Sequence, residues 1–195
     1  MKKFVLASGS PRRKELLSEI IPEFEIIPAK GEEVIKDTDP AMVVESLSKQ
    51  KCEEIFHKIL TNEGSDIVVI GADTVVSYNQ KILGKPCDKA DARRMISDFQ
   101  GDVHQVYTGV TIMYVKDSSE QSFTFHVRTD VEVYDMTDEE IESYISTDEP
   151  YDKAGGYGIQ GLFGVYVKGI RGDYNNVVGL PVSKLFHECK RLELI

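Results

Sequence analysis

The sequence contains no tryptophan and only three cysteines among its 195 residues. Cys52, Cys87 and Cys189 are odd in number, widely spaced and outside any C-x-x-C pattern. A disulfide framework and a zinc ribbon are therefore disfavoured, and a reducing compartment is expected. No apolar run approaches the roughly 18 residues of a membrane span, and too few apolar residues precede Ser8 for a signal peptide. The sequence predicts a cytoplasmic protein that does not enter the membrane.

Basic residues are in the minority, with 23 Lys and Arg against 33 Asp and Glu and a net charge of −10. This charge opposes the attraction to a phosphate backbone on which general nucleic-acid binding depends, so we expect no nucleic-acid partner. An anionic ligand would have to be attracted by a few local cations. The length suits one domain over residues 1–195, with a core large enough to fold without a disulfide or a metal.

Helical and strand periodicities alternate along the chain, which predicts an α/β fold. The two long neighbouring strands, joined by a polar turn at 116–121, make the sheet mixed rather than parallel. The apolar β-branched run at 66–70 predicts a strand buried on both faces that ends at Gly71. Strand patterns occur at 4–7, 24–27, 66–70, 103–115, 123–134 and 165–170, with a short hairpin at 75–83, and helix patterns occur at 11–20, 40–60, 88–99, 138–146 and 181–191.

The first segment that suggests chemistry is Ser8-Gly9-Ser10-Pro11-Arg12-Arg13-Lys14. Ser10 is a good N-cap and Pro11 a good first helical residue. Three cations in the first turn of a helix oppose the partial positive charge there unless an anion shares the site. The turn therefore either binds phosphate or is a solvated basic segment. The P-loop pattern G-x-x-x-x-G-K-[ST] is absent, which argues against nucleotide-driven switches and kinases of that class.

Lys51 and Asp73 are two further charged residues in unusual positions. Lys51 lies four residues from Leu47 and from Ile55 on the apolar stripe of the helix at 40–60. Its ammonium either snorkels along its own stem, which is the commoner arrangement, or faces a cleft. Asp73 follows the buried strand at 66–70, and ligand crevices of open α/β sheets lie at the carboxyl ends of strands. A turn-forming role after Gly71 is the alternative for Asp73.

The remaining signals are weaker. Glu32 and Glu33 form a carboxylate pair that either binds a divalent cation or is solvated. The stretch 156–161 matches G-x-G-x-x-G, but it follows a polar loop and leads into 162–167, which looks like a strand, so the context argues against a dinucleotide site. Glycines still let this loop approach a ligand closely. Lys85 and Lys153 add two loop cations, and the four histidines form no metal-like cluster.

Taken in order, these segments resemble the Maf family of nucleoside triphosphate pyrophosphatases, and the resemblance covers nearly the whole chain. It implies an elongated α/β fold of two lobes, with a mixed, twisted sheet, flanking helices and a central cleft, related to inosine triphosphate pyrophosphatases. It also implies hydrolysis of a nucleoside triphosphate to the monophosphate and pyrophosphate with a divalent cation, Mg²⁺ or Mn²⁺, by a cytoplasmic protein that is commonly a homodimer. The matching segments are SGSPRR at 8–13, Glu33, Lys51, GADT at 71–74, GKP at 84–86, DKAGGYGIQG at 152–161 and GLP at 179–181.

The family divides by substrate at three positions, and these place the chain with the dTTP/UTP pyrophosphatases. That branch has arginine, threonine and glutamine where this chain has Arg12, Thr74 and Gln160. The branch that acts on 7-methyl-GTP has tryptophan, glutamine and glutamate instead. An amide both donates and accepts hydrogen bonds, as a pyrimidine edge requires, whereas a carboxylate suits the donor edge of a guanine.

The resemblance also implies roles for the site residues. Asp73 would accept the proton of the water that attacks the α-phosphorus. Glu33 would hold the metal with Asp73 nearby, and the register from Phe24 favours Glu33 over Glu32 as the ligand. The residues that would bind the triphosphate are Ser8, Ser10, Arg12, Arg13, Lys51 and Lys85, with Lys153 as a further candidate.

Two other functions stay open at this point. One is a broader house-cleaning pyrophosphatase that acts on modified or purine triphosphates. The other is a regulatory or partner-binding role, because the family is associated with septum inhibition and division arrest. No basic tail or exposed amphipathic stripe in the sequence favours a partner, and such a role can coexist with catalysis.

Overall fold

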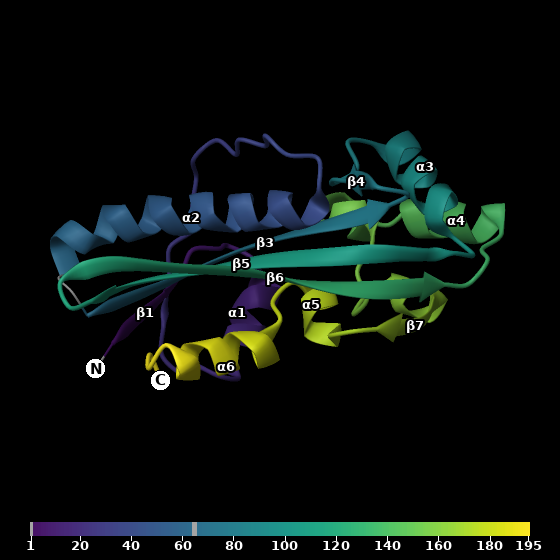
Figure 1. Ribbon diagram of the computed structural model, residues 1–195. Helices are drawn as coiled ribbons and strands as arrows, with labels where there is room; N and C mark the ends of the chain where they lie inside the picture. The colour runs from purple at the N-terminus through teal and green to yellow at the C-terminus, as the bar shows by residue number, and fades with distance from the viewer. Residues whose placement is uncertain (1, 64–65) are drawn as a thin grey trace.

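A sheet of seven strands organises the molecule, in the order β2-β1-β3-β5-β6-β7 with β4 paired to β3. The computed structural model describes residues 2–63 and 66–195 (Figure 1). The first three strands are parallel, whereas the others are antiparallel to their neighbours, so the predicted mixed α/β fold is confirmed. The strands are β1 (Lys3–Leu6), β2 (Glu25–Ile26), β3 (Ile67–Tyr78), β4 (Lys81–Leu83), β5 (Val103–Lys116), β6 (Ser119–Val133) and β7 (Val167–Arg171).

Most of the α-helices begin after a residue whose side chain caps the first turn. Ser10 accepts a hydrogen bond from the backbone N–H of Arg13 at 3.5 Å, and Thr137 and Glu140 form a capping box. A short helix capped by Asp173 was not predicted, because five residues are too few to show a periodic pattern. The helices are α1 (Pro11–Ser18), α2 (Pro40–Glu63), α3 (Lys89–Phe99), α4 (Asp138–Ile145), α5 (Tyr174–Val178) and α6 (Val182–Arg191), with 3-10 helices η1 (Glu149–Asp152), η2 (Ala154–Gly156) and η3 (Leu162–Tyr166).

Helices cover both faces of the sheet. α2 lies along one face, while α1 and α6 lie on the other (Figure 1). Alternate residues of β3 face the two layers, as the pleat of a strand requires. Ile70 packs in one cluster with Leu17 of α1 and Leu185 of α6, and Val69 packs in another with Phe56 of α2. The prediction that this strand is buried on both faces is confirmed.

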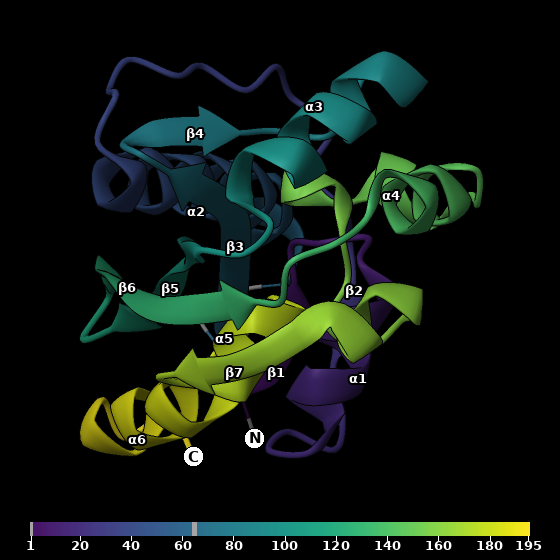
Figure 2. The same cartoon turned by 90° about the vertical axis from the view of Figure 1, so that its right-hand side faces the viewer.

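A third apolar cluster lies at the far end of the long strands. It contains Phe99 of α3, Ile145 of α4 and Phe163 of η3. Figure 2 views the molecule from this end, with α3, α4 and β7 toward the viewer. β3, β5 and β6 run through both halves of the molecule, so they connect the cores at its two ends. Within the described residues, no helix has the length and apolarity needed to cross a membrane.

Three boundaries differ from the predictions. β3 does not end at Gly71 but continues to Tyr78. The turn between β5 and β6 is only Asp117-Ser118, both in the left-handed region, and not the whole of 116–121. Residues 162–166 form a 3-10 helix rather than a strand. At 162–166 apolar composition did not distinguish a strand from a 3-10 helix, because short apolar runs fit either state.

The edge of β3 carries the feature that positions the site. On this edge β1 pairs with β3 as far as Ile70, and β4 pairs with it from Val76 onward. Residues 71–75 therefore have no strand partner on this edge among the described strands, although β5 covers the opposite edge throughout. Because successive side chains of a strand point to opposite faces, this open segment presents groups to both sides of the sheet.

Candidate active site

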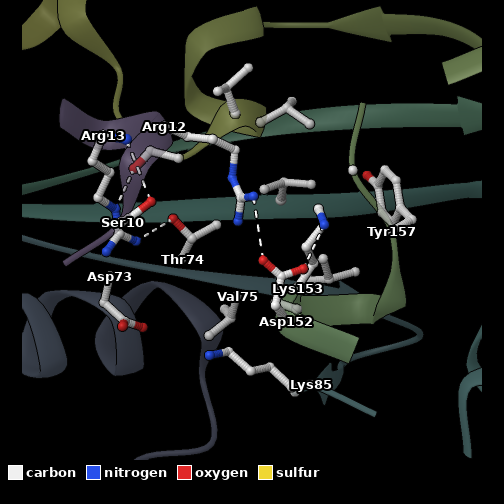
Figure 3. A pocket seen from close by; sticks show the side chains of 18 of the residues that line it. Ser10, Arg12, Arg13, Asp73, Thr74, Val75, Lys85, Asp152, Lys153 and Tyr157 are labelled. Carbon is white, nitrogen blue, oxygen red and sulfur yellow. Dashed lines mark hydrogen bonds and ion pairs between the residues drawn. The ribbon is translucent and has the colours of Figure 1, made fainter. Parts of the chain in front are cut away.

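A cavity of about 830 Å³ lies at the open edge of β3 (Figure 3). It takes side chains from α1, α2, β3, the segment that precedes α2, and the 3-10 helices. Ser8 does not line it and lies behind Arg13, whose Nη1 donates to the Ser8 hydroxyl at 3.2 Å. The predicted site residues that line the cavity are Ser10, Arg12, Arg13, Glu33, Lys51, Asp73, Thr74, Lys85, Lys153 and Gln160.

Lys51 and Asp73 form a largely buried ion pair in the cavity. The side chains of Lys51 and Asp73 are 18% and 12% exposed, and the Lys51 ammonium donates to the Asp73 carboxylate. The same ammonium lies 2.9 Å from Oε1 of Glu33. Lys51 therefore faces the cleft, and the snorkelling arrangement that is commoner for such a lysine is wrong here. The expectation that Asp73 lies at the end of a strand is also wrong, because it lies within β3 beside the unpaired edge.

Gly71 explains how α2 comes close enough for this contact. Gly71 and Asp73 are two residues apart on β3, so they face the same layer, which is α2. A Cβ atom at Gly71 would lie 2.4 Å from the carbonyl oxygen of Ser48 on α2. Only glycine permits this approach of helix to strand. The close packing brings Lys51 of α2 within reach of Asp73.

Arg13 is held on the opposite side of β3 by three acceptors. Its Nε donates to the Gly179 carbonyl at 2.9 Å, its Nη1 to Ser8, and its Nη2 to the Thr74 hydroxyl at 3.0 Å. Burial lowers the pKa of the guanidinium, while the charge of Asp73 acts in the other direction. An arginine stays protonated even so. The structure therefore fixes a desolvated positive charge at the cavity wall.

Arg12 reaches the other wall of the cavity. Its Nη1 lies 3.6 Å from the Asp152 carboxylate, and Lys153 donates to the same carboxylate at 2.5 Å. Lys153 also donates to the Glu149 carbonyl at 2.8 Å. Although burial acts to raise it, the pKa of Asp152 is lowered by the hydrogen bond from Lys153 and by the charges of Lys153 and Arg12. Figure 3 shows Arg12 and Lys153 meeting at Asp152. In the described residues Lys85 has no ion pair, and its side chain also lines the cavity.

Gln160 lies on an exposed turn between η2 and η3 that one carboxylate holds in place. Oε2 of Glu149 accepts from the backbone N–H of Leu162 at 2.7 Å, and Oε1 accepts from Phe163 at 3.3 Å. A Cβ atom at Gly161 would lie 2.3 Å from Oε2 of Glu149, so a larger residue there would displace the carboxylate that holds the loop. The position of Gln160 therefore depends on Glu149.

Tyr157 supports the same part of the cavity from the core. Its hydroxyl lies 2.6 Å from Nε2 of His104, and His104 is fully buried beside Phe99. Burial lowers the pKa of His104 to about 4, against the opposing charge of Asp102. Burial also raises the pKa of the Tyr157 hydroxyl. Both groups are therefore neutral around neutral pH.

Four groups at the site were not singled out from the sequence. Asp152 stands next to Lys153, but nothing in the pattern shows that it pairs with Arg12. Glu149 precedes Pro150 in a loop, where a carboxylate is expected to be exposed to solvent. Thr108 and the Gly179 carbonyl act through tertiary contacts that periodicity does not reveal. Only the resemblance that includes residues 152–161 and 179–181 pointed toward these regions.

Glu33 and Asp73 are the two carboxylates that could hold a metal. Within the described residues no three His, Cys, Asp or Glu side chains converge as a metal site. Both carboxylates contact one ammonium, that of Lys51, so the place between them already accommodates a positive charge. One or two carboxylates with substrate phosphate oxygens is the usual protein share of a Mg²⁺ site, so the donor set fits this ion. Of the adjacent pair, Glu33 lines the cavity and Glu32 does not.

The fold and the cavity together define an α/β protein with a cleft in which cationic side chains gather around a buried carboxylate. The model of the Maf-like protein family matches residues 3–192. The chain therefore belongs to the Maf family, and the resemblance noted in the sequence is confirmed.

Curated relatives match over nearly the full length. A dTTP/UTP pyrophosphatase of Agathobacter rectalis is 53% identical, with 98% of each chain covered. A dTTP/UTP pyrophosphatase of Bacillus cytotoxicus is 47% identical, with 99% of this chain and 97% of the relative covered. Among solved structures, a nucleoside-triphosphatase / dITP/XTP pyrophosphatase from Mycobacterium abscessus aligns over 98% of this chain and 94% of its own, with 13% identity and a TM-score of 0.43.

Proposed function

We propose that this protein hydrolyses dTTP and UTP to the nucleoside monophosphate and pyrophosphate. Water supplies the new oxygen on the α-phosphorus, the bond from this phosphorus to the α,β-bridging oxygen breaks, and pyrophosphate leaves. The observation that carries the proposal is the Asp73–Lys51 pair, set in a cationic cavity at the open edge of β3. The full-length relatives described above, which are named dTTP/UTP pyrophosphatases, support the same activity.

The triphosphate is assigned to the cationic walls of the cavity. Ser10 and the N-terminus of α1 offer a hydroxyl and backbone N–H groups, which favour phosphate oxygens. Arg12, Arg13, Lys51, Lys85 and Lys153 supply the positive charge, and Ser8 supports Arg13 from behind. Phosphoryl transfer is promoted mainly by such positioning and charge stabilisation. Substrate would replace Asp152 as the partner of Arg12.

Glu33 and Asp73 are assigned as the residues that hold a divalent cation, Mg²⁺ or Mn²⁺. Such an ion, when bound, neutralises phosphate oxygens and acidifies a water. Asp73 is assigned as the proton acceptor for the attacking water. Its side chain is only 12% exposed, so its carboxylate is shielded from bulk water. Lys51 holds that carboxylate in place, which is the orientation a general base requires.

The choice of nucleotide is assigned to the part of the cavity that includes Arg12, Thr74 and Gln160. All three line the cavity, although they come from three separate segments of the chain. The Gln160 amide can donate and accept at once, which suits the mixed edge of uracil and thymine. Thr74 is bonded to Arg13, so its contribution is tied to the phosphate side of the cavity.

A panel of nucleoside triphosphates tests the proposal. dTTP, UTP, CTP, ATP and GTP are each incubated with Mg²⁺, with Mn²⁺ and with a chelator, and the products are followed by ³¹P NMR. We expect pyrophosphate and monophosphate from dTTP and UTP above all, with no turnover in chelator. In ¹⁸O-water the label is expected in the monophosphate, since water attacks the α-phosphorus. Faster purine turnover, release of orthophosphate, or label in pyrophosphate contradicts the proposal.

A further inference from the structure

Thr74 is the first link of a chain of hydrogen bonds that leads from Arg13 into the core. Nη2 of Arg13 donates to Thr74 Oγ1 at 3.0 Å, and Thr74 Oγ1 lies 2.9 Å from Thr108 Oγ1. Thr108 Oγ1 in turn donates to the backbone carbonyl of Asn176 at 2.9 Å. Thr74 and Thr108 are directly opposite in the β3–β5 register. These hydrogen bonds therefore run along one face of the sheet, from the cavity through β3 and β5 to α5.

The number of available protons determines which group donates in each of these hydrogen bonds. A guanidinium only donates, and a backbone carbonyl only accepts. Each threonine hydroxyl has a single proton. Thr108 uses its proton on the Asn176 carbonyl, so the hydrogen bond between the two threonines must be donated by Thr74. The Thr74 hydroxyl thus accepts from Arg13 and donates to Thr108, and it has no proton left for a nucleotide base.

The far end of the chain is fixed and dry. Thr108 and Asn176 are both 0% exposed. The Asn176 side chain donates to the Val106 carbonyl and to Thr129 Oγ1, each at 3.0 Å, which ties α5 to β5 and β6. Thr108 therefore meets an acceptor that cannot shift without disturbing three elements. A hydrogen-bond chain of this kind orients its terminal group in low dielectric.

The hydrogen bonds of Arg13 determine which of its N–H donors remain for a ligand. Thr74, Ser8 and the Gly179 carbonyl take three of its five N–H donors, so among the described residues two remain for a ligand. Two donors of one guanidinium in a fixed plane match two oxygens of a phosphate. We propose that Thr74 and Thr108 are positioning residues that orient Arg13 toward the polyphosphate, and that Thr74 does not donate a hydrogen bond to the base. The proposal rests on the proposed function, from which it takes its substrate. Its main measurement, the binding of tripolyphosphate, does not depend on that function.

Inorganic tripolyphosphate separates the two roles because it has the phosphates and no base. Four variants are compared with the wild type: Thr74→Val, Thr108→Val, and the hydroxyl-retaining Thr74→Ser and Thr108→Ser. Thr111→Val is the matched control. Thr111 also lies on β5 and is 0% exposed. Its hydroxyl forms hydrogen bonds with the hydroxyls of Ser48 and Thr124, which are not partners of Arg13. Calorimetry gives the Kd of tripolyphosphate, and KM and kcat are measured for dTTP, UTP and GTP.

Both valine variants are expected to weaken tripolyphosphate binding by about tenfold, because the orientation of a charged donor is lost. KM should rise by the same factor for all three nucleotides, so the preference for dTTP over GTP stays unchanged. The serine variants should stay within about twofold of the wild type, because they keep the donor and the acceptor. Thr111→Val should leave tripolyphosphate binding unchanged even where it lowers thermal stability. In an Arg13→Lys background Thr108→Val should cause no further loss, since the group that it orients is gone.

Two results overturn the proposal. If Thr74→Val changes the dTTP to GTP preference and leaves tripolyphosphate binding intact, Thr74 reads the base. If Thr108→Val matches Thr111→Val in every measurement, the chain does not position Arg13. Should Thr108→Val fail to fold, Thr74→Val decides the question, measured alone and in the Arg13→Lys background, where it should cause no further loss. Failure of the proposed function would appear differently, as an absence of turnover with every nucleotide while the calorimetric differences persist.

Discussion

The two ends of the cavity are built from different kinds of structure. The end that we propose binds phosphate, called the phosphate end below, is built on β3, α1 and α2, which carry Arg12, Arg13, Lys51 and Asp73. The end that we propose receives the base, called the base end below, is built on the 3-10 helices and turns between 149 and 166. Strand ladders and long helices hold the first, whereas short backbone turns and hydrogen bonds to the Glu149 carboxylate hold the second. A phosphate site on strands and helices is rigid, and a loop site is more easily altered without disturbing the fold.

The difference shows in what each end needs to keep its shape. At the phosphate end Gly71 lets a whole helix pack on a strand, and Asp73 and Lys51 follow from that packing. At the base end a single carboxylate, Glu149, receives two backbone N–H groups and determines where Gln160 stands. We therefore expect changes at Asp73 and Lys51 to affect all nucleotides, and changes at Gln160 and Glu149 to affect the choice among them.

The largest expected effect is that of Asp73→Asn at the phosphate end. Loss of a general base lowers kcat by about 10²–10⁴-fold, and this should hold for every nucleotide alike. The measurement is the rate of pyrophosphate release from dTTP, UTP and GTP. Tripolyphosphate calorimetry and thermal unfolding check that the variant retains its cavity. Near-normal pyrophosphate release from dTTP would remove Asp73 from the role of proton acceptor.

The second prediction concerns the pH dependence of stability. It compares Arg13, which supports the phosphate end, with His104, which supports the base end. Arg13 does not titrate, whereas the pKa of His104 beneath Tyr157 is lowered by burial to about 4 from its usual 6.5. Between pH 6.5 and 4 His104 binds a proton in the unfolded chain but not in the folded protein. The free energy of unfolding therefore falls as the pH drops through this range. The loss is about 3 kcal/mol, since one pKa unit corresponds to about 1.4 kcal/mol.

A pH series of denaturant unfolding measures this loss. The control is His104→Gln, which keeps a polar group near Tyr157 but has no proton to gain in this range. Subtracting the two curves removes the titration of the acidic residues that both proteins share. A difference that does not change between pH 6.5 and 4 would contradict the prediction.

The sequence predicted the regular parts of the site better than the loops. Ser10 and Pro11 identify the start of α1, and the apolar β-branched run at 66–70 predicts a strand buried on both faces, because caps and short apolar runs are local signals. For Lys51 the helical pattern leaves snorkelling and a cleft-facing position both open, because its contact with Asp73 joins two separate elements. Residues 162–166 were read as a strand, since their 3-10 turn depends on Glu149, which lies outside the run. Tertiary contacts are the part that local patterns do not contain.

The third prediction addresses the base end directly. Gln160→Glu replaces an amide that donates and accepts by a carboxylate that only accepts. The specificity constant kcat/KM for dTTP and UTP should fall by about tenfold relative to that for GTP, as when one hydrogen bond to a base is lost. Tripolyphosphate binding serves as the control and should weaken far less than dTTP binding. An equal loss on every nucleotide would reject a base-reading role for Gln160.

The smallest expected effect is that of Glu149→Gln, which acts on Gln160 only through the loop. The amide keeps one oxygen but loses the charge that strengthens the hydrogen bonds from Leu162 and Phe163. The dTTP to GTP preference should therefore fall by about threefold, less than for Gln160→Glu, because a weakened hydrogen bond leaves the residue that it positions in place. The matched control is Glu140→Gln, which weakens an equivalent carboxylate bond to the backbone N–H of Thr137, 2.8 Å long, in the capping box of α4. Glu140→Gln should lower thermal stability and leave the nucleotide preference unchanged. If the two variants change the preference equally, the base end does not depend on Glu149.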